Sequence, residues 1–592
     1  MRRILWAMIV LLIGWTDGFL AVGAAELKVD FGSIAKPVDH AASGSLYGIA
    51  AEGWPEDRWI SAIHPKNFTQ MAPGGGQLAN GETAPVGDAL IVAPIAERHG
   101  ATVTIRMPDS FAQFPYIYKG DADWLARVKA MVARTVKADP PNIYAYEIWN
   151  EPDWNWKDAW GEFDAFWQRT HAAIREQDDH RAIMGPSISR WNQAWMRRFL
   201  RQAKADGALP EIVSWHELDP REANDLTRHF GAYRALEREL GIGPLPVSIN
   251  EYGAPRDSAV PGALTRLVAR LERAGTDTAD LAFWHKPGRL GDLIAPVAGG
   301  RGPATTAAPN GAFWVFKWYG DMKGVMLTTV PDSMTGPTLD GFASYDAGDR
   351  TIRIVAGGED GDHRIVISGL GEWFSPRVDV QVYAARWTGT DGTQTAPEPL
   401  FQRVLPIKDA AVAIHLANAT FRDAFLILVT PTGKGAAWTA PVKHFSTRLE
   451  AEDAKLSGAR KFPVRMAPGN FFAPTVSGNA YVGLLDRQNA SIAFTATVPA
   501  AGKYELSFGY SNGLADAAIY EVDVSGSAPV DLTFTPTQFR ELIDQAKLTV
   551  DLPAGAVTIR LKAGPRSPHM FAPSSLIEID YLDVTGLEPE TF

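Results

Sequence analysis

The chain has 592 residues, of which 46% are hydrophobic and 21% charged, and its formal net charge is −11. A chain of this length and apolar content can bury several domain cores, about one for every 150 residues. The acidic balance and the lack of any Lys/Arg run argue against binding to nucleic acid or to an acidic membrane surface. The absence of cysteine excludes disulfides, thiolate metal sites and a Cys nucleophile.

Residues 1–25 have the pattern of a secretory signal. Met1–Arg3 supplies a basic start, Ile4–Ile13 an apolar run, and Gly23–Ala25 a small-residue cleavage region. A membrane anchor would need about 20 apolar residues, and Thr16–Gly18 interrupts the run before that length. We therefore expect cleavage near Ala25 and a periplasmic or secreted protein.

Residues 26–319 alternate short apolar runs with helical periods. Helical spacing is clearest in Asp121–Val136, behind an Asp cap, and in Leu264–Leu271, which Gly275 closes. Eight apolar runs predict buried strands: Leu46–Ala50, Ala62–Met71, Ala101–Met107, Ile143–Trp149, Ile183–Ser187, Glu211–Trp215, Pro246–Asn250 and Leu281–Trp284. Eight such units in about 270 residues predict an α/β fold of the (β/α)8 TIM-barrel type, with its active site where the strands end. An open doubly wound sheet is the alternative, but no Gly-rich phosphate loop follows the first strand.

After Gly320 the helical periods give way to short alternating strands separated by turns. Residues 320–432 predict an accessory β-sandwich, from Thr351–Val355, Arg364–Ile367, Val378–Val382, Ala411–Leu416 and Ala424–Val429. Residues 433–446 predict a linker. Residues 447–592 predict a second β-sandwich, from Ser491–Val498, Lys503–Ser507, Ala518–Val524, Thr549–Leu552, Val557–Lys562 and Ile577–Val584. Three mature domains therefore fit the pattern.

Two glutamates stand at ends of predicted barrel strands. Glu151 follows the fourth strand in Tyr146–Pro152, and Glu251 ends the seventh strand in Ser248–Gly253. On a closed barrel these strands face each other across the mouth. One carboxylic acid and one nucleophilic carboxylate, about 5–5.5 Å apart, suffice to hydrolyse a glycosidic bond with retention. No His/carboxylate cluster has the spacing of a metal site, so we expect no catalytic cofactor.

The motif Trp149-Asn150-Glu151-Pro152, followed by Glu251, resembles the clan A retaining glycoside hydrolases. The resemblance is to the family 39 type in particular, which also joins its barrel to a β-sandwich, and it covers roughly residues 45–430. It implies that Glu151 is the general acid/base and Glu251 the nucleophile. It also implies that Asn150 binds the sugar hydroxyl next to the reacting carbon.

The same resemblance implies further substrate-binding residues. His216, at the end of the sixth strand, would orient the nucleophile, and Glu217 beside it is the main rival to Glu251 as nucleophile. Trp284, at the end of the eighth strand, would form the floor under the bound sugar, with His285 next to it.

Two more candidate residues leave alternatives open. Trp154 would either stack on a sugar or form, with Trp156, a lid over the barrel rim. Where many relatives carry an Arg at the end of the second strand, this chain has Phe68–Met71. Arg106, at the end of the third strand, would supply the positive charge there or pair with a neighbour. This departure affects the identity of the substrate and leaves the reaction class unchanged.

The C-terminal module resembles carbohydrate-binding modules of the family 6/35 type. Three segments carry the resemblance: Leu449–Ala454, Gly478–Val482 and Ile577–Asp583. It implies a structural calcium ion with charged ligands from Glu450, Glu452 and Asp580, and sugar contacts from Tyr510, Asn512 and Gly513. The alternative for these acids is a charge pattern that keeps edge strands soluble.

These patterns together predict a secreted retaining glycoside hydrolase acting on a plant or microbial polysaccharide or its oligosaccharides. The resemblance favours a substrate that contains pentose units. Three alternatives stay open: a catalytically silent carbohydrate-binding protein, an endo-acting hexose-specific glycanase of the same clan, and a polysaccharide lyase with a Tyr or His base. The sugar, its linkage and the exo or endo mode of action are not determined by the sequence.

Overall fold

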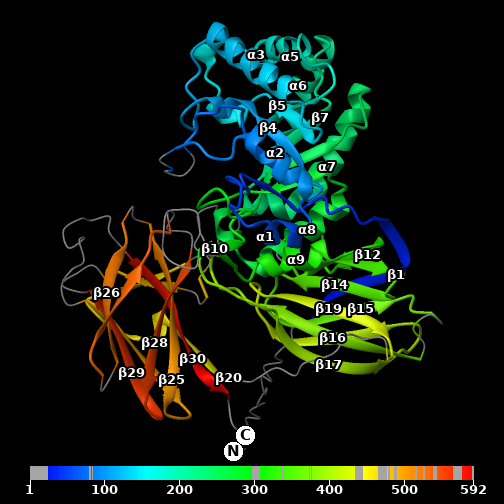
Figure 1. The fold of residues 1–592 in the computed structure, drawn as a ribbon. Coiled ribbons are helices and arrows are strands. Elements are labelled where there is room, and N and C mark those ends of the chain that lie inside the picture. The colour runs from blue at the N-terminus through cyan, green and yellow to red at the C-terminus, as the bar shows by residue number, and fades with distance from the viewer. Residues whose placement is uncertain are drawn as a thin grey trace, which may run out of the picture.

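The structure is a computed structural model that describes most of residues 24–592 (Figure 1). It leaves out residues 79–81, 83, 297–306, 337, 372–373, 375, 434–443, 465–475, 478–479, 486–489, 514–515, 525–526, 538–542, 564–576 and 590–592, and the side chains of 220–224, 296 and 588–589. Nearly all of the expected leader, most of the expected linker, and Gly478 and Asn479 therefore lie outside the described residues.

The predicted TIM barrel is confirmed. Eight strands close into a barrel in chain order, and β9 pairs with β2 in parallel through Gly44 with Asp280 and Ser45 with Leu281. The barrel strands are β2 (Gly44–Leu46), β3 (Asn67–Met71), β4 (Thr102–Arg106), β5 (Ile143–Glu147), β6 (Ala182–Ile188), β7 (Ile212–Glu217), β8 (Val247–Tyr252) and β9 (Thr278–Leu281).

The first and last barrel strands are displaced toward the N-terminus of their predicted runs. The first strand ends at Leu46 because Tyr47 adopts a left-handed backbone conformation, with φ of 46°. The hydroxyl of Tyr47 then donates to Asp109. The last strand ends at Leu281, so that Trp284 lies in the loop, where its backbone N–H donates to Asp292 over 2.8 Å. Polar tertiary contacts outweigh the apolar pattern at both positions.

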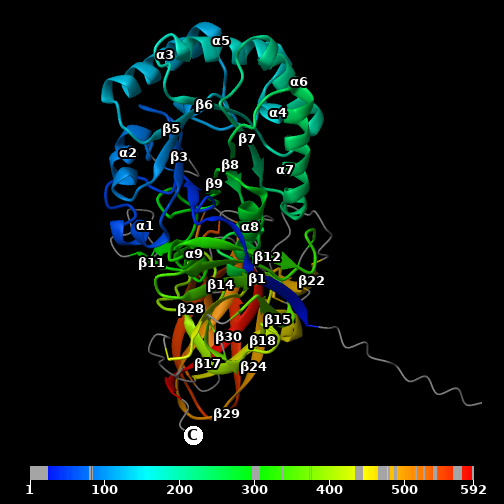
Figure 2. The same ribbon diagram turned by 90° about the vertical axis from the view of Figure 1, so that its right-hand side faces the viewer.

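Helices surround the barrel, as Figure 2 shows. They are α1 (Asp57–Ile63), α2 (Ala89–Arg98), α3 (Asp121–Ala138), α4 (Pro152–Asn155), α5 (Phe163–Arg175), α6 (Gln193–Ala205), α7 (Pro220–Leu240), α8 (Pro261–Ala274) and α9 (Phe313–Gly320). Gly120, with no capping side chain, precedes α3, and the expected Asp cap is replaced by Asp121 and Asp123 in the first turn. These charges suit the positive end of the helix dipole. None of the described helices is long and apolar enough to cross a membrane.

Helix α8 joins the barrel to the second domain. Every residue from Pro261 to Glu272 is buried, although the sequence predicted a single apolar face. The second face packs against β strands of the accessory domain, where Arg270 and Arg273 pair with Asp340. A helix that is buried all round forms part of an interior, so the barrel and the accessory domain share one core.

The accessory domain is a sheet of nine strands in the order β17-β16-β19-β14-β13-β12-β1-β15-β18. Its strands are β1 (Ala25–Pro37), β12 (Val325–Pro331), β13 (Asp340–Asp346), β14 (Thr351–Gly357), β15 (Gly361–Ser368), β16 (Arg377–Ala385), β17 (Glu398–Pro406), β18 (Val412–Ala419) and β19 (Ala424–Pro431). The sequence analysis assigned residues 26–37 to the barrel. The structure places them here instead, where β1 pairs with β12 and β15 (Figure 1).

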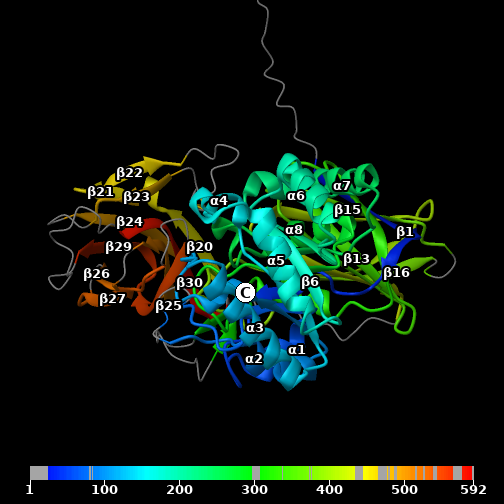
Figure 3. The same ribbon diagram turned by 90° about the horizontal axis from the view of Figure 1, so that it is seen from above.

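The C-terminal module consists of two packed sheets around a core of its own. In Figure 3 it lies beside the barrel and the accessory domain. One sheet contains β20 (His444–Glu450), β22 (Arg460–Pro463), β23 (Ala480–Gly483), β25 (Gly502–Asn512), β28 (Asp544–Leu552) and β30 (Ile577–Pro589), and the other contains β21 (Lys455–Ser457), β24 (Ser491–Val498), β26 (Ala518–Val524), β27 (Val530–Phe534) and β29 (Gly555–Ala563). The predicted second β-sandwich is therefore confirmed.

Candidate active site

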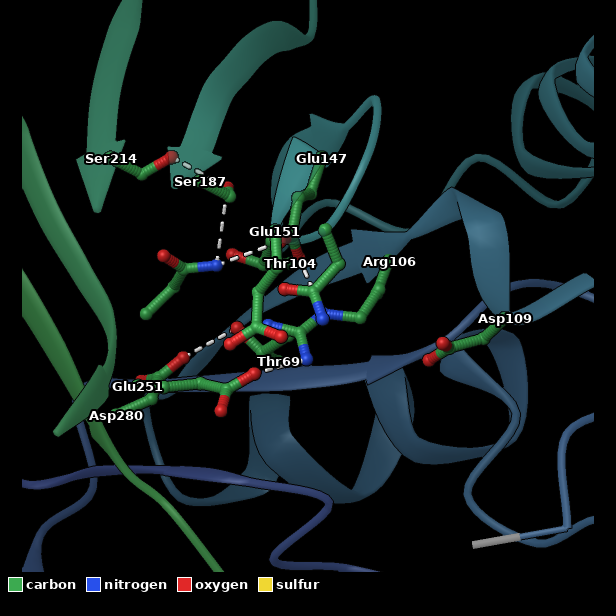
Figure 4. A network of polar contacts seen from close by, with 12 residues as sticks. Thr69, Thr104, Arg106, Asp109, Glu147, Glu151, Ser187, Ser214, Glu251 and Asp280 are labelled. Atoms are coloured by element: carbon green, nitrogen blue, oxygen red, sulfur yellow. Dashed lines mark hydrogen bonds and ion pairs between the residues drawn. The ribbon is translucent and has the colours of Figure 1, made fainter. Parts of the chain in front are cut away.

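Glu151 lies in a strained turn just beyond strand β5. Its φ is 54°, a left-handed conformation that costs a residue other than glycine about 1–3 kcal/mol. The turn is held by a hydrogen bond of 2.9 Å from the backbone N–H of Glu151 to the carbonyl of Ser187. Pro152 then begins the short helix α4. The backbone thus leaves the barrel sharply while the Glu151 side chain stays at its mouth (Figure 4).

His216 stands between the two candidate carboxylates. It lies on β7 and is paired directly with Glu251 on the neighbouring strand β8. Its Nδ1 is 3.1 Å from Oε1 of Glu151, and its Nε2 is 3.8 Å from Oε1 of Glu251. One atom from each of the three side chains falls within 4.8 Å of the other two. The sequence analysis placed His216 beside the nucleophile, and the structure shows that it also contacts Glu151.

Arg106 links two acidic side chains under the mouth of the barrel. Its Nη1 donates to Oε1 of Glu251 over 2.5 Å, and its Nε donates to Oε2 of Glu147 over 2.8 Å (Figure 4). The other oxygen of Glu147 accepts from Asn250 over 2.8 Å. Glu147 is completely buried, whereas the Glu251 side chain keeps 11% of its exposure. A substrate can therefore reach Glu251 and cannot reach Glu147.

The charges of this cluster stabilise one another. Burial lowers the pKa of Arg106, but Glu147 and Glu251 outweigh it, and the net shift is upward. Burial likewise lowers the pKa of His216, and the carboxylates of Glu251 and Glu151 raise it above its ordinary value. Arg106 therefore stays cationic beside Glu251.

Among the described residues, Glu151, His216 and Glu251 are the one group of three His, Asp or Glu side chains close enough to share a metal ion. The sequence analysis expected no such cluster. The guanidinium of Arg106, 2.5 Å from Glu251, repels a second cation at this place because like charges so close together are unfavourable. The group is thus better suited to proton transfer than to metal binding.

Asn150 and Trp154 flank Glu151, and Trp149 lies beneath them. Trp149 is buried within an aromatic cluster, and its indole N–H donates to Asn155 over 2.9 Å. Within the described residues, Oδ1 of Asn150 has no hydrogen-bond partner although it is buried. Trp154 is 53% exposed, and its indole N–H donates to Oε2 of Glu151 over 2.8 Å. One polar group and one aromatic face are thus left for a ligand.

Glu217 is held away from the mouth. Its Oε1 accepts from Trp215 over 2.7 Å and lies 2.9 Å from Nδ1 of His229 on α7. Successive residues of a strand point to opposite faces, so His216 points into the barrel and Glu217 toward the surrounding helices. The structure thus brings Glu251, and not Glu217, close to Glu151 at the barrel mouth.

Trp284 and His285 separate beyond β9. The indole N–H of Trp284 donates to the carbonyl of Gly253, two residues after Glu251, over 3.2 Å. His285 is buried, with Nδ1 3.4 Å from Asp292 and Nε2 3.3 Å from Thr390 of the accessory domain. Trp284 therefore stays next to strand β8, which carries Glu251, whereas His285 lies at a junction between domains.

The sequence analysis missed several polar residues of this site. Glu147 was readable as a charge within an otherwise apolar strand, and Asn250 as a second Asn-Glu pair with Glu251. Asp109 had no such signal. It is buried between the hydroxyls of Tyr47 and Tyr116, and burial raises its pKa to about 7.

The predicted calcium ligands come together only in part. The carboxylates of Glu450 and Asp580 both accept hydrogen bonds from Ser477, and Arg422 lies 4.0 Å from Asp580. Burial raises the pKa of Glu450 and raises that of Asp580 to about 7. Among the described residues, Glu452 does not complete a compact group of three acids with these two.

The predicted sugar contacts of the C-terminal module differ in exposure. Tyr510 is buried and its hydroxyl contacts Thr535, while Asn512 is buried and donates to the carbonyl of Phe534 over 3.0 Å. Gly513 is exposed. Of these three residues, Gly513 is the one that lies on the surface.

Comparison with known proteins agrees with the resemblance that the sequence showed. The chain is 26% identical over 558 residues to 3-O-alpha-D-galactosyl-alpha-L-arabinofuranosidase of Bifidobacterium longum subsp. longum, covering 81% of this chain and 47% of that one. It is 26% identical over 563 residues to 3-O-beta-L-arabinopyranosyl-alpha-L-arabinofuranosidase of Bifidobacterium pseudocatenulatum, covering 81% of this chain and 55% of that one. The chain spans about half the length of the curated relatives it matches.

One solved structure is similar to a large part of the chain. The protein N2152 of Neocallimastix frontalis matches with a TM-score of 0.64 and 29% identity, over 69% of this chain and all (100%) of that one. No model of a protein family matches the chain. The predicted resemblance to glycoside hydrolases is confirmed by the named relatives.

Proposed function

We propose that the protein is a retaining glycoside hydrolase, with Glu151 as general acid/base and Glu251 as nucleophile. One observation carries the proposal: oxygen atoms of the two carboxylates approach within 4.8 Å across the barrel mouth. Retaining enzymes hold this pair about 5–5.5 Å apart, whereas inverting enzymes need about 6.5–9.5 Å to admit a water molecule. The observed separation leaves no room for that water.

The first step transfers the sugar to the protein. Oε of Glu251 attacks the anomeric carbon, the bond to the leaving oxygen breaks, and Glu151 gives its proton to that oxygen. The ion pair with Arg106, at 2.5 Å, holds the Glu251 carboxyl group in place for the attack. In the second step Glu151 takes a proton from water, the water oxygen attacks the same carbon, and Glu251 leaves.

His216 couples the two carboxylates during this cycle. Nδ1 of His216 lies 3.1 Å from Oε1 of Glu151, and the hydrogen bond between them orients the carboxyl group of the acid. When Glu251 becomes an ester, its negative charge disappears and the pKa of His216 falls. The pKa of His216 thus depends on whether Glu251 is ionised or esterified, and its fall supports the change of Glu151 from acid to base.

The proposed substrate is an α-L-arabinofuranosyl unit of a polysaccharide or oligosaccharide, with or without a sugar on its O3. The two named relatives are α-L-arabinofuranosidases whose names specify a 3-O-glycosylated unit, and a pentose is what the sequence favours. Within the described residues, Oδ1 of Asn150 and Nη2 of Arg106 are buried without partners near the carboxylates. An acceptor and a donor left in this way suit sugar hydroxyl groups, because an unpaired buried polar atom is costly until a ligand satisfies it.

Export of the protein remains part of the proposal. Strand β1 starts at Ala25, so a cut after residue 24 or 25 would leave the nine-stranded sheet complete. N-terminal sequencing of the protein recovered outside the cytoplasm tests the cut: a start near residue 25 supports it, and an intact Met1 contradicts it.

In the C-terminal module we propose a calcium ion at Glu450 and Asp580, with the module binding glycans. The buried carboxylate of Asp580 and the half-buried one of Glu450, both beside Ser477, offer the oxygen ligands that a hard cation prefers. Calcium binding would raise the melting temperature of the wild type and leave that of Asp580→Asn unchanged. An equal response to calcium in both proteins would contradict this site.

The function is tested by assaying the purified protein on chromogenic α-L-arabinofuranosides and on a wider panel of glycosides. We expect Glu151→Ala and Glu251→Ala to lose about 10²–10⁴-fold in kcat, with azide rescuing each variant and giving products of opposite anomeric form. Glu217→Gln, a glutamate on the other face of the neighbouring strand, is the matched control and should keep its activity. NMR of the first product should show retention.

Each contrary outcome has a definite meaning. Inversion of the anomeric centre would overturn the mechanism. Full activity in Glu251→Ala would remove the nucleophile assignment. If nothing on the panel is cleaved and sugars still bind, the catalytically silent carbohydrate-binding protein replaces the hydrolase.

A further inference from the structure

The loop that follows β9, residues 282–293, contacts the accessory domain where that domain meets the C-terminal module. Arg289 of this loop donates to Oδ1 of Asp391 in the accessory domain over 2.8 Å, and His285 lies 3.3 Å from the hydroxyl of Thr390. The backbone N–H of Asp391 in turn donates to Oδ1 of Asp544 in the C-terminal module over 3.1 Å. Three domains therefore meet at one polar junction.

The same loop carries Trp284 at the active site. Asp292 accepts from the backbone N–H of Trp284 over 2.8 Å and from the hydroxyl of Ser258 over 3.0 Å, and it lies 3.4 Å from His285. Trp284 reaches the carbonyl of Gly253 beside the nucleophile. The position of the Trp284 ring thus depends on how firmly the contacts with the accessory domain hold the loop 282–293.

The accessory domain approaches the C-terminal module too closely for a side chain at Gly389, and the turn that holds this contact leaves no room for one at Gly392. Gly389 has φ of 73°, and a Cβ there would lie 2.9 Å from Oδ1 of Asp544. A Cβ on Gly392 would lie 1.8 Å from the carbonyl of Thr388 and 3.1 Å from Gln545. A glycine, which lacks a Cβ, is required where the backbone lies this close to a neighbouring atom.

Apolar packing surrounds the junction as well. A small core cluster takes residues from all three domains: Val260, Ala263, Trp387, Ile543 and Tyr581. The rings of Trp387 and Tyr581 meet edge to face with centroids 6.0 Å apart. The module is therefore docked by a packed interface with both polar and apolar parts.

Two carboxyl groups face each other in this interface. Asp544 is 1% exposed, and within the described residues its Oδ2 has no hydrogen-bond partner. Asp391, whose side chain is 25% exposed, is paired with Arg289. A buried carboxylate without a partner is costly, so the facing pair is stable when it holds a single proton between its oxygens.

We propose that Asp391 and Asp544 are positioning residues for the barrel loop 282–293, which makes the docked C-terminal module part of the catalytic unit. This inference rests on the proposed function, because it takes Trp284 to line the sugar site. A module attached only by a tether would act by raising the local concentration of substrate. The junction gives this module a second role, in the shape of the active site itself.

The shared proton makes the docking depend on pH. Burial, and next the charge of Asp391, raise the pKa of Asp544 well above its ordinary value. Burial opposes ionisation of Asp391, but Arg289 and His285 outweigh it and lower the pKa of Asp391. Tyr510 also feels the charges of both acids, and Asp292 lies on the other side of Arg289 and acts on that guanidinium.

The sign follows from which state binds the proton more tightly. Docked Asp544 holds its proton more tightly than an undocked carboxyl does, so docking weakens as pH rises from the ordinary Asp value through the raised pKa. Docked Asp391 holds its proton less tightly than an undocked carboxyl does. Its contribution to docking is therefore lost as pH falls through its lowered pKa. Docking is therefore firmest near the ordinary Asp pKa of 3.8, because Asp391 weakens it below that value and Asp544 weakens it above.

The test compares full-length variants by kinetics and by hydrogen exchange of the loop 282–293. In Asp544→Ala the backbone N–H of Asp391 loses its acceptor, and we expect KM to rise about tenfold with kcat changed less, because sugar binding loses a firm floor. Asp544→Asn keeps the acceptor and adds an amide donor toward Asp391, so it should restore KM and abolish its rise at high pH. Asp551→Asn, exposed on the same strand β28, is the matched control.

Hydrogen exchange separates this inference from the proposed function. Faster exchange of the loop in Asp544→Ala, and not in Asp551→Asn, supports the coupling even if no glycoside is cleaved. If the wild type cleaves glycosides while Asp544→Ala keeps both its loop protection and its KM, the positioning role is overturned. If Asp544→Ala fails to fold, Asp544→Asn decides whether the positioning role holds. Loss of the pH dependence of KM in that variant is expected only if the two acids share a proton.

Discussion

At the barrel mouth, some acidic residues are accessible to a substrate and others are not. Glu151 and Glu251 keep 10% and 11% of their side-chain exposure, while Glu147 behind them keeps none. Breaking a buried ion pair by removing one partner costs about 3–5 kcal/mol. Glu147 therefore stabilises the buried end of Arg106 and aims its other end at Glu251.

Replacing Glu147 should damage catalysis without touching the substrate. In Glu147→Gln the amide oxygen still accepts from Asn250, but Arg106 loses one of its two negative partners and shifts relative to Glu251. We expect kcat/KM to fall about 10–10²-fold, measured by steady-state kinetics. Glu217→Gln, an equally buried glutamate on β7, should leave kcat/KM unchanged. Equal losses in both variants would show a general loss of stability instead.

Trp154 combines a hydrogen bond to the acid with an exposed ring. In Trp154→Phe the ring remains and the N–H donor to Glu151 is lost, while in Trp154→Ala both are lost. We expect the Phe variant to change the acid/base limb of the pH–rate profile and the Ala variant also to raise KM for substrates with a sugar leaving group. Activity on 4-nitrophenyl glycosides, whose leaving group needs little protonation, should change least. An unchanged profile in both variants would assign Trp154 to a lid.

At the scale of secondary-structure elements, polar side chains inside the barrel tie the strands together. Oδ2 of Asp280 on β9 accepts from Asn67 and Thr69 of β3, over 2.9 Å and 2.5 Å, and Asn67 also contacts Thr104 of β4. Burial raises the pKa of Asp280 to about 7. This layer lies next to Arg106 in Figure 4 and supports the site from within the barrel.

The raised pKa of Asp280 makes the barrel less stable at high pH. A buried acid of this kind destabilises the fold increasingly as pH rises from its ordinary value of 3.8 to about 7, by up to about 4 kcal/mol. In Asp280→Asn the amide oxygen can still accept from Asn67 and Thr69, and this part of the pH dependence should vanish. Thermal unfolding at about pH 5 and about pH 8 checks it. A pH dependence identical to that of the wild type would contradict the assignment.

At the scale of the whole molecule, the barrel and the accessory domain form one folding unit. Strand β1 comes first in the chain and lies between β12 and β15, which come after the barrel. The largest apolar cluster extends from the barrel helices into the sheet, where it includes Phe342, Val355 and Ala424. The C-terminal module has a separate core.

Removal of the first strand tests this unity. A chain that starts at residue 38 lacks β1, so the sheet loses a strand paired on both sides, and we expect the barrel and the sheet to be lost together. The measurement is expression followed by calorimetry, with a chain that starts at residue 24 as control. A stable barrel in the shorter chain would show that the two domains fold independently.

Much of the fold follows from local patterns in the sequence. The period of the apolar residues predicts the eight strands and the surrounding helices, and alternating residues predict the later β strands. Glu151 and Glu251 were found because both stand at strand ends, and the closure of a barrel brings such ends together. These features depend on residues that are near one another in the chain, where periodicity is informative.

Other features depend on contacts that no local pattern encodes. The position of β1 in the distant sheet, the second buried face of α8, and the separation of Glu217 from Glu251 were decided by packing between segments far apart in the chain. The same holds for the bridge from Arg106 to Glu147 and for the meeting of Asp391 with Asp544. The sequence by itself determined the eight barrel strands and singled out the pair of acids; only the tertiary structure decided where the strands end and which buried charges face each other, because burial and charge pairing act through space, independently of chain order.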